Sequence, residues 1–479
     1  MDLKKSLEKI INYENEFKPL DIRVDNIPIW PILRYLELGN VKNFENKNFE
    51  NNFDYSKLLP RKPNFLKYFY SKIKLKYFEL KLRQNLRNLN PITSIFLSNI
   101  SEHYTTKLKG KYLNQNIDPY LFSFDKVSKK NIKISLFLEI ERLFNVENIN
   151  QKLVHKILSK KIIIYNHKKI FKNLDWSKFK KSNIEFDEDQ LKFLILKLLA
   201  SISIYKLIFK VLKPDNLFVA CYYSLLNSPA IIAANNLGIN TIDIQHGKQG
   251  VYHHFYNHFS ELYFTNNPFL PKYFWLWDEK FKINITKWFS KDIKFPKIII
   301  GGNLWLEEFN KILPMKYYEN KLKLKKNLAL IALQPIKDLN YKLLKNIIEN
   351  NQNITFLIRF HPIQKNGKQE ISSQFKNYKN VKIKIANELP LFFLLKKVDF
   401  VITYWSTVCL DALEFGKKSI LIHENGFHQF KSYIEEGYLE YSCDKIAINK
   451  IIKKIKRIKI SKSSFKLTTK EIINLLRSD

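Results

Sequence analysis

The stretch Thr241-Ile-Asp-Ile-Gln-His-Gly-Lys-Gln-Gly250 decides how the rest of the chain is interpreted. Its apolar half predicts a buried strand, which stops abruptly at His246 and Gly247. An apolar run at 217–220 and a helix-forming segment at 229–237 precede it. The order strand, helix, strand predicts a βαβ unit, whose ligands bind beyond the carboxyl ends of the strands. We therefore expect His246 to lie where such a fold places its chemistry.

The same alternation continues on both sides of this unit. A second pattern of strands and helices begins near Lys297, and residues 273–288 are expected to form an aromatic helix or turn that crosses between domains. Further strands are predicted at 93–98, 132–138, 161–165, 261–265, 328–333, 354–360, 381–385, 400–404 and 419–423. Strands and helices that alternate twice over predict an α/β protein with two doubly wound sheets that face a cleft.

These patterns divide the chain into four parts. Residues 1–90 form a helical, aromatic preface, and 91–290 and 291–445 form the two doubly wound domains. Residues 446–479 are expected to form a basic, helical C-terminal tail.

Within the preface, residues 67–89 have the spacing of a basic amphipathic helix. Lysines and arginines separate its apolar residues, and two interpretations remain open: an ordinary core face with a solvated back, or contact with a membrane surface. The apolar positions are Phe69, Ile73, Tyr77, Leu80 and Leu86.

The chain of 479 residues is strongly basic, with 81 Lys and Arg against 45 Asp and Glu and a formal net charge of +36. A charge of this size indicates an anionic partner, such as nucleic acid, an anionic lipid surface or a phosphorylated substrate. The basic residues are spread along the chain, however, so part of the excess reflects a general enrichment in lysine.

Three cysteines, Cys221, Cys409 and Cys443, lie far apart and indicate neither a disulfide framework nor a zinc site. The N-terminal residues lack the apolar core of a signal peptide, and no window approaches the roughly 20 apolar residues of a membrane span. We expect a cytoplasmic protein that is soluble or peripheral on the inner face of the membrane.

A candidate anion site follows the predicted strand at 354–360. Arg359 and His361 stand at its carboxyl end, where a guanidinium binds phosphate with two hydrogen bonds and an imidazole can donate another. The alternative is a histidine that ends the strand before Pro362.

A second set of candidates follows the predicted strand at 400–404. Ser406 and Thr407 cap the next helix, and hydroxyls beside free N–H groups at a helix N-terminus form a phosphate site. Asp411 and Glu414 lie three residues apart on one face of that helix, where either could reach sugar hydroxyls.

Metal sites are not expected. His253, His254 and His258 lie close in sequence, but no cysteine joins them and we expect them to line a loop. The acids of Asp187-Glu-Asp189 are expected to occupy the first turn of a helix rather than to bind a metal. The chain also lacks the motifs of dinucleotide oxidoreductases, P-loop NTPases, zincins and serine hydrolases.

The Gln-His-Gly loop, Arg359-Phe-His-Pro362 and the Ser-Thr helix cap that ends at Gly416 together resemble bacterial surface-polysaccharide glycosyltransferases of the two-Rossmann-domain (GT-B) type. Capsule polysaccharide transferases look similar, and polysialyl- and CDP-glycerol glycerophosphotransferases look more distantly so. The resemblance is best over 213–429. It departs from the family where Asp411 stands in place of the usual glutamate, which leaves open whether Asp411 or Glu414 meets the donor ribose.

The resemblance implies a nucleotide-activated sugar on the C-terminal domain, a polysaccharide or lipid-linked acceptor on the N-terminal domain, and no metal or other cofactor. His246 would be either the general base for the acceptor hydroxyl or a phosphate ligand. The donor phosphates would be held by Arg359, His361, Ser406 and Thr407, beside Asp411 and Glu414. Gln245, Gly247 and Lys248 would line the cleft loop around His246.

Two rivals remain. A CDP-glycerol-type glycerophosphotransferase would leave the phosphate attached to its product. A non-enzymatic protein that binds nucleic acid or an anionic membrane would account for the charge, but such binding needs lysine and arginine rather than imidazoles at strand ends. We therefore expect no nucleic acid partner, whereas an anionic inner-membrane surface is retained as a candidate partner.

Overall fold

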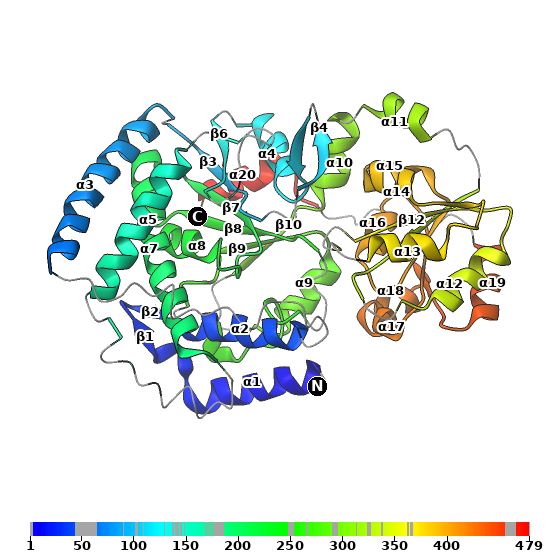
Figure 1. The fold of residues 1–479 in the computed structure, drawn as a ribbon, viewed down its shortest axis with the longest axis horizontal. Coiled ribbons are helices and arrows are strands. Elements are labelled where there is room, and N and C mark those ends of the chain that lie inside the picture. Colours follow the sequence, from blue (N-terminus) through cyan, green and yellow to red (C-terminus); the bar gives the residue numbers. More distant parts are fainter. Residues whose placement is uncertain are drawn as a thin grey trace. The chain divides into compact units, whose positions relative to one another are not determined.

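The structure, a computed structural model, describes most of the chain and divides it into two compact units (Figure 1). The first unit comprises the described residues of 1–103, 109–303 and 465–479, and the second those of 104–108 and 304–464. The residues that the structure does not describe are 1–2, 44–64, 90, 101–103, 109, 129, 137, 139–142, 144–145, 148, 168–169, 172–173, 175, 177–185, 248–252, 265–266, 290–295, 313, 323–326, 337–338, 362–363, 365–366, 456–465 and 479.

The first unit is built on a six-stranded parallel sheet in the order β6-β3-β7-β8-β9-β10. Its central strands are buried throughout and mostly apolar, as expected of a parallel sheet that is covered on both faces. The winding direction reverses between β3 and β7. The strands are β3 (Ser94–Leu97), β6 (Asn131–Ile134), β7 (Asn216–Ala220), β8 (Asn240–Ile244), β9 (Tyr273–Leu276) and β10 (Lys297–Ile300).

Helices surround this sheet (Figure 1). The longest, α7 (Glu188–Leu212), begins at Asp187, whose side chain accepts a hydrogen bond from the N–H of Gln190, and Glu188 and Asp189 occupy its first turn as expected. The other helices are α1 (Leu3–Phe17), α2 (Trp30–Asn43), α3 (Phe65–Arg87), α4 (Asp118–Asp125), α5 (Gln151–His167), α8 (Ser228–Asn235), α9 (Glu279–Thr286) and α20 (Thr469–Ser478), with 3-10 turns η1 (Pro19–Asp21) and η5 (Glu261–Phe264). Short strands β1 (Arg23–Val24) and β2 (Ile27–Pro28) form a hairpin, and β5 (Lys111–Asn114) also belongs to this unit.

The second unit contains another six-stranded parallel sheet, in the order β13-β12-β11-β14-β15-β16. Numbered within the sheet from β11, this is the order 3-2-1-4-5-6 that dinucleotide-binding folds share, and the winding reverses between β11 and β14. The strands are β11 (Leu328–Ala332), β12 (Thr355–Arg359), β13 (Val381–Lys382), β14 (Phe400–Thr403), β15 (Ser419–Leu421) and β16 (Leu439–Tyr441).

The helices of the second unit are mostly short, and β4 (Tyr104–Leu108) is grouped with them. Amphipathic α12 (Tyr341–Glu349) buries Leu344, Ile347 and Ile348 against the sheet residues Ile331, Ile358 and Ile402, which are all fully buried. The remaining helices are α10 (Leu304–Ile312), α11 (Met315–Leu322), α13 (Lys368–Gln374), α14 (Lys384–Glu388), α15 (Leu391–Lys397), α16 (Val408–Leu413), α17 (Glu424–Gln429), α18 (Lys431–Glu435) and α19 (Lys445–Lys454).

The predicted fold class, an α/β protein with two doubly wound parallel sheets and a helical N-terminal region, is confirmed. Several predicted strands are wrong. Residues 161–165 belong to α5, 261–264 form the 3-10 turn η5, and the strand predicted at 381–385 is cut to two residues by α14. The first two are short, largely apolar runs, which fit a buried helix or a buried strand equally well, whereas 381–385 alternates apolar and basic residues, a pattern that predicts a strand.

Two assignments near the predicted domain boundaries also differ. The aromatic segment 273–288 supplies β9 and then α9, and β10 pairs with β9 rather than opening the second pattern. Ile299 and Ile300 are buried there. An apolar run of this kind fits the edge strand of one sheet as well as the first strand of another. None of the described helices combines the length and apolar character that crossing a bilayer demands.

The predicted C-terminal tail consists of two different parts. Helix α19 belongs to the second unit, whereas α20 packs on the first, where Leu467 donates its N–H to the carbonyl of Ile300 and the carbonyl of Leu476 accepts from Asn240. Because α20 also buries Ile472 and Ile473, it is an integral part of the first unit rather than a polar extension.

Candidate functional site

The loop after β8 is held in place by Gln245. Its backbone N–H donates to the carbonyl of Trp275 over 2.9 Å, its side-chain Nε2 donates to the carbonyl of Gly247 over 2.9 Å, and its Oε1 accepts from the N–H of Trp277 over 2.8 Å. Gln245 is only 1% exposed. Its side chain therefore ties the loop that carries His246 to the segment after the neighbouring strand β9.

His246 is half-buried and contacts a tyrosine that the sequence did not mark. Its Nε2 atom lies 3.3 Å from the Oη of Tyr223, which follows the neighbouring strand β7. The ring of Tyr223 stacks on Phe255, with centroids 4.1 Å apart and planes 8° apart. Burial raises the pKa of Tyr223 well above its ordinary value, so the hydroxyl stays protonated at neutral pH. The signal that could have marked Tyr223 is its place in the loop that follows a buried strand.

Beneath His246, Asp243 organises a buried polar cluster. Its Oδ2 accepts from the hydroxyl of Tyr256 over 2.5 Å and its Oδ1 from the N–H of Tyr222 over 2.9 Å. The hydroxyl of Tyr222 donates in turn to the carbonyl of Phe255. Burial raises the pKa of Asp243 to about 8, against the lowering effect of these hydrogen bonds. The cluster therefore fixes the strand ends that carry Tyr223 and His246.

The rest of the predicted loop is described only in part. Gly247 is half-buried, and a methyl group built on its Cα would meet no described atom within 4 Å, so packing does not require glycine there. Lys248 lies outside the described residues. Its predicted role in the loop remains a prediction.

The three neighbouring histidines have structural surroundings. The carbonyls of His254 and His258 accept from the buried guanidinium of Arg34, and the ring of His258 lies 4.4 Å from that of Trp288. Burial, with the charges of Arg34 and Lys287, lowers the pKa of His258 to about 4. Among the described residues, no group of three or more His, Cys, Asp or Glu side chains is placed to hold a metal ion.

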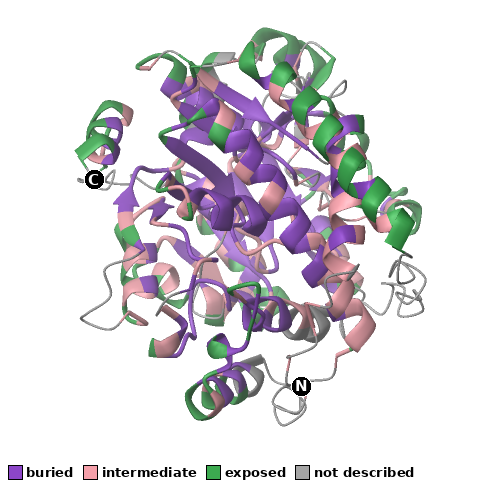
Figure 2. Ribbon diagram, turned by 90° about the vertical axis from the view of Figure 1, so that its left-hand side faces the viewer, coloured by how far each residue is buried: buried purple, intermediate pink, exposed green. Residues whose placement is uncertain are grey.

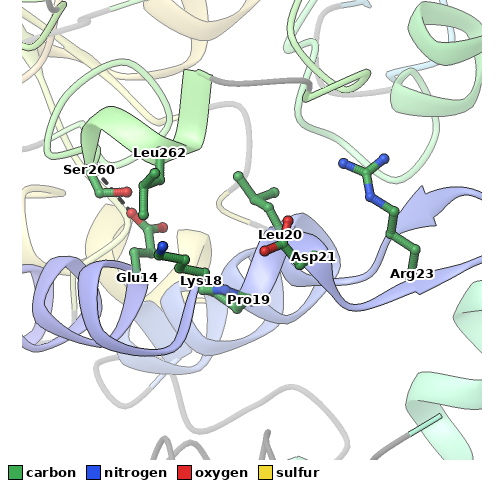
Figure 3. Close-up of a pocket in the computed structure, with 8 residues that line it drawn as sticks. All are labelled: Glu14, Lys18, Pro19, Leu20, Asp21, Arg23, Ser260 and Leu262. Atoms are coloured by element: carbon green, nitrogen blue, oxygen red, sulfur yellow. Dashed lines mark hydrogen bonds between the residues drawn. The ribbon is translucent and has the colours of Figure 1, made fainter.

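A small pocket lined by residues of α1, η1 and the segment around Ser260 is also structural (Figure 3). Its volume is about 100 Å³, below the range of several hundred Å³ typical of ligand sites. The carboxylate of Glu14, in its wall, accepts from the N–H of Ser260 over 3.1 Å and from the indole of Trp30 over 2.8 Å, and it pairs with Arg34. These bonds fasten the N-terminal helices α1 and α2 to the segment around Ser260.

In the second unit, predicted site residues lie where the sheet reverses direction. Gln334 follows β11, and its Oε1 accepts from the N–H of Trp405, in the loop after β14, over 2.8 Å. Ser406 and Thr407 come next and are half-buried. The Oγ of Ser406 accepts from the N–H of Val408 over 3.3 Å, whereas the hydroxyl of Thr407 makes no capping bond to the described part of α16. Open α/β sheets bind ligands at this position.

Arg359 stands at the end of β12 and is partly engaged by the protein itself. Its Nη1 donates to the carbonyls of Ala386 and Leu389, each over 2.6 Å, at the end of α14. Burial lowers the pKa of Arg359 to about 10, so it remains a cation at neutral pH. Burial also lowers the pKa of the half-buried His361, which follows. The guanidinium thus caps the end of α14.

The acids after Thr407 differ in their surroundings. Asp411 is half-buried, and burial, followed by the charge of Glu414, raises its pKa to about 7. Glu414 is exposed. Gly416, with a φ of 66°, closes the helix in the left-handed conformation that favours glycine. Near neutral pH, Asp411 can therefore either donate or accept a hydrogen bond with a hydroxyl group.

The predicted residues thus fall into two groups, one in each unit. In the second unit, β12, β11 and β14 are neighbours, so their ends share one edge and the outer two are about 10 Å apart. This edge brings the strand ends that carry Arg359 and His361 near the one that carries Ser406 and Thr407. His423, at the end of β15, joins them, since its ring lies 4.5 Å from that of Trp405. Gln334 and His423 were not predicted.

No family model matches this chain, and no curated protein matches it. Among solved structures, it is similar to the UDP-GlcNAc 2-epimerase of Methanocaldococcus jannaschii in complex with UDP-GlcNAc and UDP, with 15% identity and a TM-score of 0.48 over 81% of this chain and 99% of that one. The UDP-GlcNAc 2-epimerase of Neisseria meningitidis bound to UDP-GlcNAc gives 13% identity and a TM-score of 0.48 over 81% and 100%. The glycosyltransferase of kitacinnamycin gives 10% and 0.38 over 81% and 94%. Similarity at this level carries no information about activity.

Proposed function

We propose that this protein is a glycosyltransferase that uses a nucleotide-activated sugar. The observation that carries the proposal is the strand order of the second sheet, whose reversal between β11 and β14 coincides with Gln334, Ser406 and Thr407. Sheets with this order bind nucleotides at the reversal. The hydroxyl of Thr407 and the cation of Arg359 at the same edge suit the phosphates of such a ligand.

On this proposal the second unit holds the donor. Ser406 and Thr407 bind the phosphates through their hydroxyls, and Arg359 and His361 contribute positive charge and N–H donors at the neighbouring strand end. Groups fixed in this way stabilise the negative charge that develops on the departing nucleotide. Asp411 would bind a sugar hydroxyl, with Glu414 as the alternative.

On the same proposal the first unit binds the acceptor, and His246 is its functional residue. Two roles for the imidazole remain within the proposal: it takes the proton of the acceptor hydroxyl, or it holds a phosphate. The hydroxyl of Tyr223 orients the ring in either case. The acceptor is proposed to be a growing surface polysaccharide or a lipid-linked sugar, and the site of action the cytoplasmic face of the membrane.

The role of His246 is tested with His246→Ala in the full-length protein. If the imidazole is the base, transfer falls by about 100-fold or more, the range for general bases, while nucleotide affinity measured by calorimetry stays unchanged. His246→Ala that loses nucleotide affinity would make the residue a phosphate ligand. A variant with normal turnover would remove His246 from the site.

The class of reaction is tested by product analysis with CMP-, CDP-, UDP- and GDP-activated sugars. The proposal predicts a new glycosidic bond and a released nucleotide. A phosphodiester in the product would replace it with a glycerophosphotransferase, and an isomeric sugar nucleotide formed without acceptor would replace it with an isomerase. Binding to nucleic acid or anionic lipid without any turnover, and steeply weakened by salt, would support the non-enzymatic alternative that the charge of +36 suggests.

A further inference from the structure

Helix α3 has two apolar faces, of which only one is covered by the residues that the structure describes. Leu82 and Leu86 are almost fully buried on the side that packs against α5 and α7. The opposite side exposes large apolar residues that recur every three or four positions and so form one stripe along the helix. They are Phe65 (71% exposed), Leu66 (76%), Phe69 (55%), Tyr70 (55%), Ile73 (55%), Tyr77 (51%) and Leu80 (61%).

This arrangement corrects the prediction of a single apolar face. Phe69, Ile73, Tyr77 and Leu80 belong to the exposed stripe, whereas Leu86 belongs to the buried side. A core face with a solvated, polar back therefore does not describe α3. Figure 2 views the molecule from the side that α3 occupies in Figure 1, and it colours the exposed residues green.

Basic side chains border the stripe on both sides. The helix carries seven lysines and arginines and a single acid, Glu79, which is paired with Lys161 over 2.8 Å. Lysines 67, 74 and 81 recur every seven residues along one border, and Lys72, Lys76 and Arg83 follow the other.

The lysines and tyrosines of this face are arranged together. The Nζ atoms of Lys74 and Lys81 lie 5.5 Å and 5.1 Å from the ring centroids of Tyr70 and Tyr77. Lys160, on the neighbouring α5, lies 5.7 Å from the ring of Tyr70 and extends the basic border onto that helix. The result is an apolar strip with cations along its edges.

We propose that the exposed face of α3 docks in the plane of an anionic membrane surface. A helix of 23 residues extends for about 35 Å, and one with apolar and aromatic residues on one face and lysine and arginine beside them rests at the boundary of headgroups and acyl chains. The basic borders match anionic headgroups. This inference goes beyond the proposed function and stands without it.

The same charges argue against the other occupants of this face. A second copy of α3 would bring two sets of cations together in either orientation, which opposes a homodimer. Nucleic acid would match the cations but would leave Leu66, Ile73 and Leu80 without apolar contacts, because phosphate groups bind charge rather than aliphatic surface.

The experiment is flotation of the full-length protein with vesicles of phosphatidylcholine alone and with an equal-part mixture of phosphatidylcholine and phosphatidylglycerol. We expect binding to the anionic vesicles only, weakened by salt. The triple variant Phe69→Ser, Ile73→Ser, Leu80→Ser should lower partitioning by about tenfold or more, because less apolar surface enters the bilayer. Its matched control replaces three equally exposed apolar residues elsewhere, Ile283→Ser, Tyr317→Ser and Ile446→Ser, and should bind normally.

A charge variant tests the borders independently. Lys67→Gln, Lys74→Gln, Lys81→Gln should weaken binding by about fivefold for each lysine removed. Lys316→Gln, Lys379→Gln and Lys382→Gln, which are exposed and lower the net charge equally, should have little effect.

Both α3 variants should keep the unfolding midpoint of the wild type, since the changed side chains are exposed, apart from the half-buried Lys74. Failure of the wild type to bind anionic vesicles, or equal effects of variants and controls, would overturn the proposal. It would also be overturned if the stripe variant lost a dimer seen by sedimentation, or lost binding to a polynucleotide, rather than binding to vesicles.

Discussion

Asp243 shows how one buried carboxyl organises the loop that carries His246. The groups that hydrogen-bond to it are the hydroxyl of Tyr256 and the backbone N–H groups of Tyr222 and Cys221, with no cation among the causes that shift its pKa. Desolvation therefore dominates, and the carboxyl retains its proton up to a pH of about 8. The identity of this residue could be read from the sequence, but its burial depends on how the loops at 222 and 256 fold over it.

The pH dependence of stability tests this description. Because the pKa rises from about 4 in the unfolded chain to about 8 in the fold, the folded state binds the extra proton between these values. The free energy of unfolding should fall by up to about 1.4 kcal/mol per pH unit as the pH rises through this window. Asp243→Asn removes this contribution, so its stability, measured by urea denaturation, should fall less steeply. The exposed control Asp215→Asn should parallel the wild type, and an Asp243→Asn curve that also parallels it would contradict the description.

The role of Tyr223 can be tested with a conservative substitution. Tyr223→Phe keeps the ring that stacks on Phe255 and removes only the hydroxyl beside His246. We expect the turnover number to fall by about tenfold, the effect of one hydrogen bond of roughly 1.4 kcal/mol, with little change in nucleotide affinity. The pH profile of turnover should shift as well, which a purely structural defect would not cause. An unchanged profile and turnover number would remove Tyr223 from the site.

At the scale of elements, the sequence predicts best where a strand, a helix and a strand follow one another directly. The segments 217–220, 229–237 and 241–244 appear as β7, α8 and β8 with nearly the predicted bounds. Residues 161–165 mislead because three isoleucines in a row suit a strand, whereas in α5 they continue the helical spacing of Val154 and Ile157.

Helix α20 could not be placed from its sequence, because its apolar residues do not say which unit they cover. Ile472 is fully buried, although it lies near the end of the chain. Ile472→Ala should lower the free energy of unfolding of the first unit by about 2–5 kcal/mol, the range for truncating a buried isoleucine. The matched control is the exposed Asn474→Ala on the same helix, and denaturation monitors both. Equal stabilities of the two variants would show that α20 is not part of the core.

For the whole molecule, the alternation of strands and helices was sufficient to predict two α/β sheets. The order of the strands within each sheet was not predictable, because parallel strands are joined through helices and any neighbour can pair. That order places the ends of β11 and β15, which carry Gln334 and His423, on either side of the end of β14, which carries Ser406 and Thr407. Sequence spacing alone does not show which strand ends are neighbours, so these two residues were not predicted. The predicted cleft between the two sets of site residues remains a prediction.

The central claim is that a nucleotide binds where the second sheet reverses direction. It is tested most directly by calorimetric titration of the full-length protein with UDP, CDP, CMP and GDP, followed by the same titration of Ser406→Ala, Thr407→Val with the nucleotide that binds. Loss of hydrogen bonds to a charged phosphate should raise the Kd by at least about tenfold. The control Ser372→Ala, Ser373→Ala, another adjacent hydroxyl pair of the same unit, should leave the Kd unchanged. Binding of no nucleotide, or equal Kd values for both variants and the wild type, would contradict the claim.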